Sequence, residues 1–187
     1  GGVVLKSGKL AISADNRLGG APAVIDGFYD NIKFDGGTLR TTAAITLNGN
    51  RGIYITPNGG TFELGTGASS SATRVTAEGN FTKSGNNGLT LSGMYLLNAN
   101  NLRVDSSQNT LTLSGNVIGE NKNVTMGGAG TVTLSGGMTI GTGTLTKDGN
   151  GTMNITSAAS NTMSAAAITA RARSSSPIRA PVGLWKS

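Results

Sequence analysis

Hydrophobic and polar residues alternate over short stretches of this chain, and the stretches return at a nearly fixed spacing. Leu-Thr-Leu-Ser-Gly stands at 89–93 and again at 111–115, Val-Thr-Leu-Ser-Gly stands at 132–136, and Met-Asn-Ile-Thr-Ser stands at 153–157. Alternation with a period of two is typical of a β-strand with one buried face. A long, regular repeat of this kind indicates a solenoid, in which each repeat buries its apolar side against the next one.

From residue 81 onward the repeats can be aligned in three registers. The first contains Leu89, Leu111, Val132 and Met153, the second Leu96, Val117 and Met138, and the third Phe81, Leu102, Val124 and Leu145. Turns rich in Gly, Asn and Ser separate the registers. We therefore predict an all-β fold, a parallel β-helix (β-solenoid) with about three short strands per 21–22-residue coil. Roughly seven coils fit in the chain, which gives a rod ~35 Å long at the inter-strand spacing.

The regular pattern does not cover the whole chain. Residues 1–35 are the least regular part, and we expect them to form an irregular first coil or cap. Residues 171–187 match no repeat and contain clustered arginines, Pro177, Pro181 and the tryptophan Trp185. The sequence thus predicts a solenoid domain at 1–170 and a basic, non-repeat tail at 171–187.

Composition narrows the chemistry that is available. The 187 residues contain no Cys and no His, which excludes disulfides, thiolate metal sites, cysteine nucleophiles, histidine-based triads and histidine zinc sites. Aromatic residues make up only 4% of the chain, as expected if the interior of a narrow coil has little room for rings. The chain also lacks an apolar run of ~20 residues that could span a membrane as a helix.

The net charge of +6 does not indicate a nucleic-acid partner. Four of the basic residues that produce it lie in the acid-free tail 171–187, so residues 1–170 carry only +2. A groove that follows phosphates needs clustered basic residues with stacking aromatic side chains, and the repeats have neither. We expect no nucleic-acid binding.

The carboxylates do not form a catalytic pattern. The chain has nine: Asp15, Asp26, Asp30, Asp35, Glu63, Glu78, Asp105, Glu120 and Asp148. When the chain is aligned at the repeat period, no two acids stack in one column, and Asp105 is expected beside Lys83 and Met126. Paired acid–base catalysis therefore has little support. Asp26, Asp30 and Asp35 are the one place for a calcium site, but their spacing fits no calcium-loop motif.

We accordingly predict no catalytic, cofactor-binding or metal-binding residues, and no cofactor. Lys83 and Lys147 occupy the same position of the repeat phrase, which favours repetition over catalysis. The Thr-x-Thr pairs at 110–112, 131–133 and 144–146 are similar to the threonine columns of ice-binding solenoids, although outward threonine is also simply a good strand residue.

Four segments resemble autotransporter-associated β-strand repeats: residues 14–20, 36–48, 81–93 and 145–155, the last with the phrase Leu-Thr-Lys-Asp-Gly-Asn-Gly-Thr-Met-Asn-Ile. The resemblance covers roughly residues 1–157 and is specific for the repeat class, not for an activity. It implies a right-handed parallel β-helix that is secreted through an outer-membrane barrel and displayed on the bacterial surface. No barrel-like series of alternating strands follows, and the chain starts at Gly1, so we expect a passenger segment.

These observations favour a non-enzymatic, extracellular β-helix that serves as a structural spacer or adhesin-like passenger. Two alternatives stay open. The first is a filament subunit that associates with itself through open coil ends. The second is a β-helix enzyme acting on polysaccharide, or an ice-binding solenoid. A surface glycan or protein ligand is a further expected partner, which the sequence leaves undefined.

Overall fold

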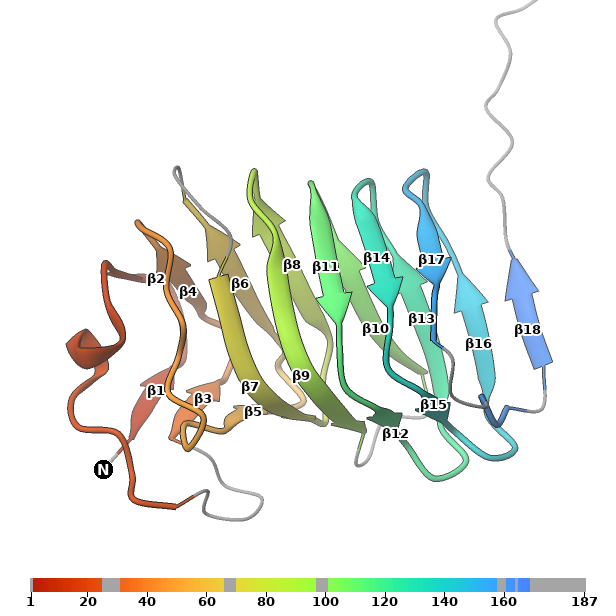
Figure 1. Ribbon diagram of the computed structural model, residues 1–187, viewed down its shortest axis with the longest axis horizontal. Coiled ribbons are helices and arrows are strands. Elements are labelled where there is room, and N and C mark those ends of the chain that lie inside the picture. The colour runs from red at the N-terminus through yellow and green to blue at the C-terminus, as the bar shows by residue number, and fades with distance from the viewer. Residues whose placement is uncertain are drawn as a thin grey trace, which may run out of the picture.

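The computed structural model describes residues 2–24, 31–65, 70–96, 101–157, 161–163 and 165–168. The described part is all-β except for one 3-10 turn, η1 (Asp15–Leu18), and every strand pairing in it is parallel. The chain forms a β-solenoid whose coils follow one another at the predicted period. In Figure 1 it runs down the near side and up the far side while advancing from left to right, which is the sense of a right-handed helix.

One side of the solenoid, which we call the third face, is a single sheet of eight strands. In spatial order these are β2 (Lys9–Ile12), β4 (Thr38–Thr41), β6 (Gly60–Leu64), β8 (Phe81–Gly85), β10 (Asn101–Ser106), β13 (Asn123–Gly127), β16 (Thr144–Lys147) and β18 (Ala165–Ile168). Each strand pairs only with the strands of the coils before and after it. The eight strands are close to the predicted number of roughly seven coils.

The other two sides are joined by two long strands. The first face contains the Leu-Thr-Leu phrases, and the second face follows it along the chain. The first face consists of β11 (Thr110–Leu113), β14 (Thr131–Leu134), β17 (Met153–Ile155) and the first halves of β7 (Ser70–Ala77) and β9 (Leu89–Leu96). The second face consists of β1 (Val3–Leu5), β3 (Ile32–Phe34), β5 (Ile53–Ile55), the second halves of β7 and β9, β12 (Val117–Ile118) and β15 (Met138–Thr139). From β7 to β16 the predicted three strands per coil are therefore present.

Residues 1–35 are more regular than predicted. Val3 pairs with Ile32 and Lys9 with Thr38, so β1 and β2 already belong to the second and third faces of the solenoid. The irregular part is the connection that follows β2 and contains η1. Residues 25–30 in this connection, and the predicted boundary at 170 with the tail 171–187, lie outside the described residues.

The first predicted register is confirmed, and the other two need a correction of two residues at one step. Leu89, Leu111, Val132 and Met153 pair in succession. Val117, however, pairs with Met94 and not with Leu96. A shift of two residues keeps the same side chains inward, so the hydrophobic pattern alone could not distinguish the two alignments.

The same two-residue shift occurs on the third face. Phe81 pairs with Val104 and not with Leu102. Asp105 pairs with Thr82 and Gly127, each one residue away from the predicted partners Lys83 and Met126. Its register therefore places Asp105 beside no other ionisable residue on either neighbouring strand.

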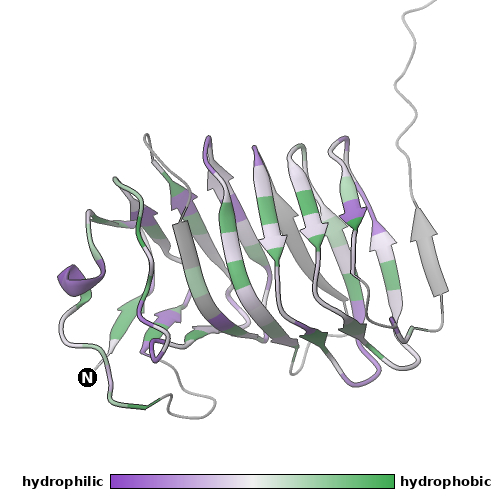
Figure 2. Cartoon of the chain, viewed as in Figure 1, coloured by the Kyte–Doolittle hydropathy of each residue, from purple (hydrophilic) through white to green (hydrophobic). Residues whose placement is uncertain are grey.

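Inward residues of all three faces form one continuous core, which appears as alternating apolar bands along the strands in Figure 2. The prediction that rings do not fit inside is wrong, because Phe34, Phe62 and Phe81 are almost completely buried. Room for a ring comes from glycine in the next coil. A Cβ on Gly60 would lie 2.4 Å from the Cβ of Phe34, so residue 60 must have no side chain.

Asparagine side chains connect neighbouring coils at the corners. Asn109 and Asn121 adopt positive φ angles of 54° and 52°, which Asn tolerates better than most residues. Asparagine side chains replace backbone pairing where the strands end. Asn109 Nδ2 donates to the Asn86 carbonyl. In the same way, Oδ1 atoms accept backbone N–H groups of the next coil: Asn116 from Gly137, Asn121 from Thr142 and Asn123 from Thr144. The corners are thus hydrogen-bonded from coil to coil, as the strands are.

Candidate functional site

The described carboxylates are held separately from one another. Glu63 pairs in register with Arg40 and Ser84, and Asp148 Oδ1 accepts the backbone N–H of Gly149. In no described strand pairing does an acid lie directly beside another acid. The described residues contain no group of three or more His, Cys, Asp or Glu side chains that could hold a metal ion.

The calcium hypothesis rested on three aspartates, of which two, Asp26 and Asp30, lie outside the described residues. The third, Asp35, uses its Oδ1 to accept hydrogen bonds from Asn58 Nδ2 at 2.7 Å and from Thr56 Oγ1 at 2.8 Å. These two bonds, that of Asn58 first, hold the pKa of the Asp35 carboxyl below its usual value. Asp35 therefore joins one coil to the next at a corner.

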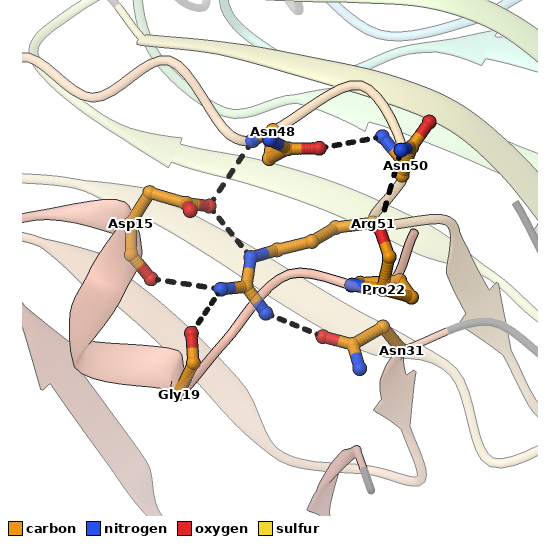
Figure 3. Close-up of polar contacts among 7 residues, drawn as sticks. All are labelled: Asp15, Gly19, Pro22, Asn31, Asn48, Asn50 and Arg51. Atoms are coloured by element: carbon orange, nitrogen blue, oxygen red, sulfur yellow. Dashed lines mark hydrogen bonds and ion pairs between the residues drawn. The ribbon is translucent and has the colours of Figure 1, made fainter. Parts of the chain in front are cut away.

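A buried arginine in the N-terminal part of the solenoid forms a polar network (Figure 3). Arg51 is completely buried, and its Nε lies 2.7 Å from Asp15 Oδ1. The Nη atoms donate to Asn31 Oδ1 at 2.5 Å and to the backbone carbonyls of Asp15 and Gly19. A guanidinium can satisfy this many acceptors in fixed directions, so one side chain holds the connection after β2 against the second coil.

Two asparagines extend the network around Arg51. The backbone N–H of Asn48 donates to Asp15 Oδ1, and Asn48 Oδ1 accepts from the backbone N–H of Asn50. The Asn50 amide then donates to the carbonyls of Pro22 and Ala23. The contacts to Asp15, Gly19, Pro22 and Ala23 join η1 and its flanking residues to the second coil. We therefore interpret the network as a cap that closes the side of the first coils.

Lys83 is an inward-facing lysine. It pairs in register with Phe62 and is completely buried, with Nζ donating to the carbonyl of Gly85 at 2.8 Å and to that of Gln108. Burial lowers the pKa of the Lys83 ammonium to about 8. Lys147, which is half-buried, likewise donates to two corner carbonyls, those of Asp148 and Gly149.

The prediction that the two lysines share one repeat position is wrong in detail. Lys147 pairs with Met126, Met126 with Val104 and Val104 with Phe81, so its partner column reaches Phe81 rather than Lys83. The two-residue shift on the third face accounts for the difference. Both lysines nevertheless use backbone carbonyls at a corner as their partners.

A polar cavity of about 270 Å³ lies where the third face turns toward the first. Its side chains come from successive coils: Arg40 from β4, Glu63 from β6, Asn86 and Asn87 from the corner after β8, and Gln108 from the corner after β10. The carbonyls that bind Lys83 belong to Gly85 and Gln108, which also line it.

Charges around the cavity are unequal. The Glu63 carboxylate is 2.5 Å from Lys9 Nζ and 3.5 Å from Arg40 Nε, so two cations share one anion. The Nε atom of Arg40 is buried and has no hydrogen-bond partner among the described residues. Sequence reasoning missed the pairing of Arg40 with Glu63. The signal was present, because the Gly-Gly-Thr phrase at 36–38 returns at 59–61 and places these two residues at equivalent positions.

Threonines lie side by side on the outer surface of the first face. Thr110 pairs with Thr131 and Thr112 with Thr133, which places two Thr-x-Thr pairs next to each other. The pair at 144–146 belongs to β16 on the third face, as expected. Ice binding stays a prediction, which a thermal hysteresis measurement on the purified chain would test.

Within the described residues, no helix is long and apolar enough to cross a membrane. Comparisons with protein families, curated proteins and solved structures found no significant match. The resemblance to autotransporter-associated repeats therefore remains a prediction that rests on the residues alone.

Proposed function

We propose that this chain is a non-catalytic β-helical segment of a secreted or cell-surface protein, in which it serves as a structural spacer or adhesin-like passenger. The observation that carries the proposal is the uninterrupted stack of parallel strands, each paired only with its neighbours. Such a stack converts chain length into axial length. Asp15, Asp35 and Glu63 are held in separate corner and ion-pair contacts, which supports a scaffold more than a hydrolase.

A spacer should tolerate changes in its number of coils, because its function is its length. Val132 pairs with Met153, so removal of residues 132–152 deletes one coil and leaves equivalent residues joined. We expect this variant to fold and to be shorter by ~4.8 Å. Because the chain has no cysteine, Ser13→Cys and Asn154→Cys provide two exposed labelling sites, and electron spin resonance between attached labels measures the change.

Removal of residues 132–142 alone is the matched control, since it takes out half a coil and breaks the register. That variant should lose β structure by circular dichroism. In the parent protein, cell-surface display and adhesion should survive deletion or duplication of the full coil. Loss of adhesion on removal of a correctly folded coil would refute the spacer function and assign a specific site to that coil.

Self-association is a second proposal, favoured by two exposed apolar residues in the first coil. Val4 in β1 is 52% exposed and Leu10 in β2 is 38% exposed, and each strand is paired on one side within the described residues. Unpaired strand edges readily accept another strand. Light scattering should show a mean molar mass that rises with protein concentration, and the double variant Val4→Lys, Leu10→Lys should abolish this rise. A monomer mass that stays constant in the wild type would refute self-association.

A further inference from the structure

The cavity at the corner between the third and first faces has the properties of a binding site for a polar, negatively charged ligand. Its volume of about 270 Å³ lies slightly below the ~300–1,000 Å³ of sites for drug-sized molecules, which suits a monosaccharide unit. Side-chain amides of Asn86 and Gln108 contribute both donors and acceptors, whereas Asn87 Nδ2 already donates to the Gly65 carbonyl. Sugar hydroxyl groups likewise both donate and accept hydrogen bonds.

The electrostatics favour an acidic sugar over a neutral one. Arg40 and Glu63 are the charged residues among the described lining residues, and Lys9, which contacts Glu63 from outside the lining, leaves the three with one net positive charge. The ammonium of Lys83 adds positive charge behind the cavity, where it bonds to the carbonyls of Gly85 and Gln108. A ligand carboxylate would therefore enter a region of positive potential.

Arg40 is the group that would receive the carboxylate. Its side chain is 39% exposed, and its contact to Glu63 is long at 3.5 Å. The planar fork of an arginine matches a carboxylate with two parallel hydrogen bonds. We propose that the corner cavity binds a uronic acid unit of an acidic polysaccharide, with the sugar carboxylate on Arg40 and its hydroxyls on the amides of Asn86 and Gln108.

This inference goes beyond the spacer function and does not depend on it. The test is a titration of the ¹⁵N-labelled chain with a galacturonic acid disaccharide, followed by NMR. We expect saturable shifts centred on the backbone amides of Gly65, Gly85 and Asn87. The methyl ester of the same disaccharide, which lacks the charge, should bind about tenfold more weakly, the loss expected for one charged hydrogen-bonded contact.

Two variants and one control locate the binding. Arg40→Gln should raise the Kd of the acid about tenfold, the change that one charge-assisted contact supplies. Asn86→Asp places a carboxylate at an exposed position of the cavity and should weaken binding of the acid more than binding of the ester. Arg17→Gln changes the same charge at an exposed site in η1 and should leave the Kd unchanged.

Several results would overturn the proposal: no shifts at the cavity amides, equal affinity for acid and ester, or an unchanged Kd in Arg40→Gln. Sodium acetate that saturates the same amides with equal affinity would also overturn it, because a bare anion site needs no sugar. Amide spectra of the variants with the dispersion of the parent spectrum show that each one is folded. These outcomes leave the coil-deletion test of the spacer function unaffected.

Discussion

The burial of Lys83 makes stability depend on pH in an unusual direction. Its ammonium is completely buried, and its pKa falls from 10.5 to about 8 in the folded chain. Below pH ~8 both folded and unfolded chains carry the proton, and the full cost of burying the charge opposes folding. Between about pH 8 and pH 10.5 the folded chain loses the proton while the unfolded chain keeps it, so the free energy of unfolding rises with pH.

The size of the effect follows from the shift in the pKa. At 1.36 kcal/mol per pKa unit, the fall from 10.5 to about 8 corresponds to a gain on the order of 3 kcal/mol across this range. The carbonyls of Gly85 and Gln108 keep their partner, because a neutral amine still has two N–H donors. Deprotonation thus removes the buried charge and preserves both hydrogen bonds.

Urea denaturation at pH 7.5, 9 and 10.5, with wild type and Lys83→Met compared at each pH, measures this gain in the free energy of unfolding. Subtracting the free energies of the two chains cancels the titration of the tyrosines and of the other lysines. From the lowest to the highest pH, the free energy of unfolding of the wild type should rise by about 3 kcal/mol relative to Lys83→Met, a change that follows from the pKa shift. Lys147→Met is the control. If the difference in free energy of unfolding between wild type and Lys83→Met does not change with pH, the reasoning is refuted, because the carbonyls would then fully compensate burial of the charge.

Two further predictions concern the first coils. Arg51→Met should lower stability by about 2–4 kcal/mol, somewhat less than loss of a fully buried ion pair because the Asp15 side chain is 24% exposed. Limited proteolysis should then cleave residues 14–24 faster, and Arg51→Lys should recover only part of the lost stability. Unchanged cleavage in Arg51→Met would argue against the cap. Gly60→Ala should cost about 1–3 kcal/mol, because the new Cβ meets Phe34. Gly20→Ala, where nothing lies within 4 Å of the new Cβ, should leave the melting temperature unchanged, and equal melting temperatures for both alanine variants would show that the contact with Phe34 relaxes freely.

The sequence predicted the fold because the solenoid depends on local information. Alternation of Leu111, Thr112 and Leu113 defines which side chains point inward, and the repeat period defines the partner strand. Alignment failed where Phe81 pairs with Val104, because a two-residue shift satisfies the same alternation. The choice between such alignments depends on the lengths of the corners, which hydrophobicity does not encode.

The candidate site was less predictable for a related reason. Arg40 and Glu63 occupy equivalent positions of a repeated phrase, so their pairing could have been inferred from the repeat. The position of Lys83 could not, since lysine at an inward position contradicts the expectation that charged residues face solvent. Contacts of Arg51 with Asp15 and Gly19 span the irregular connection, where no period relates one residue to another.

The pairing of each strand with adjacent coils alone has a mechanical consequence. Backbone hydrogen bonds run along the rod, so tension applied to the two ends loads the terminal coil first and leaves the rest intact. One coil, such as the segment from Val132 up to Met153, occupies ~4.8 Å of the axis but extends to about 70 Å when pulled straight. A tether built this way would lengthen in discrete steps under load, each step dissipating work, before force reached whatever it connects.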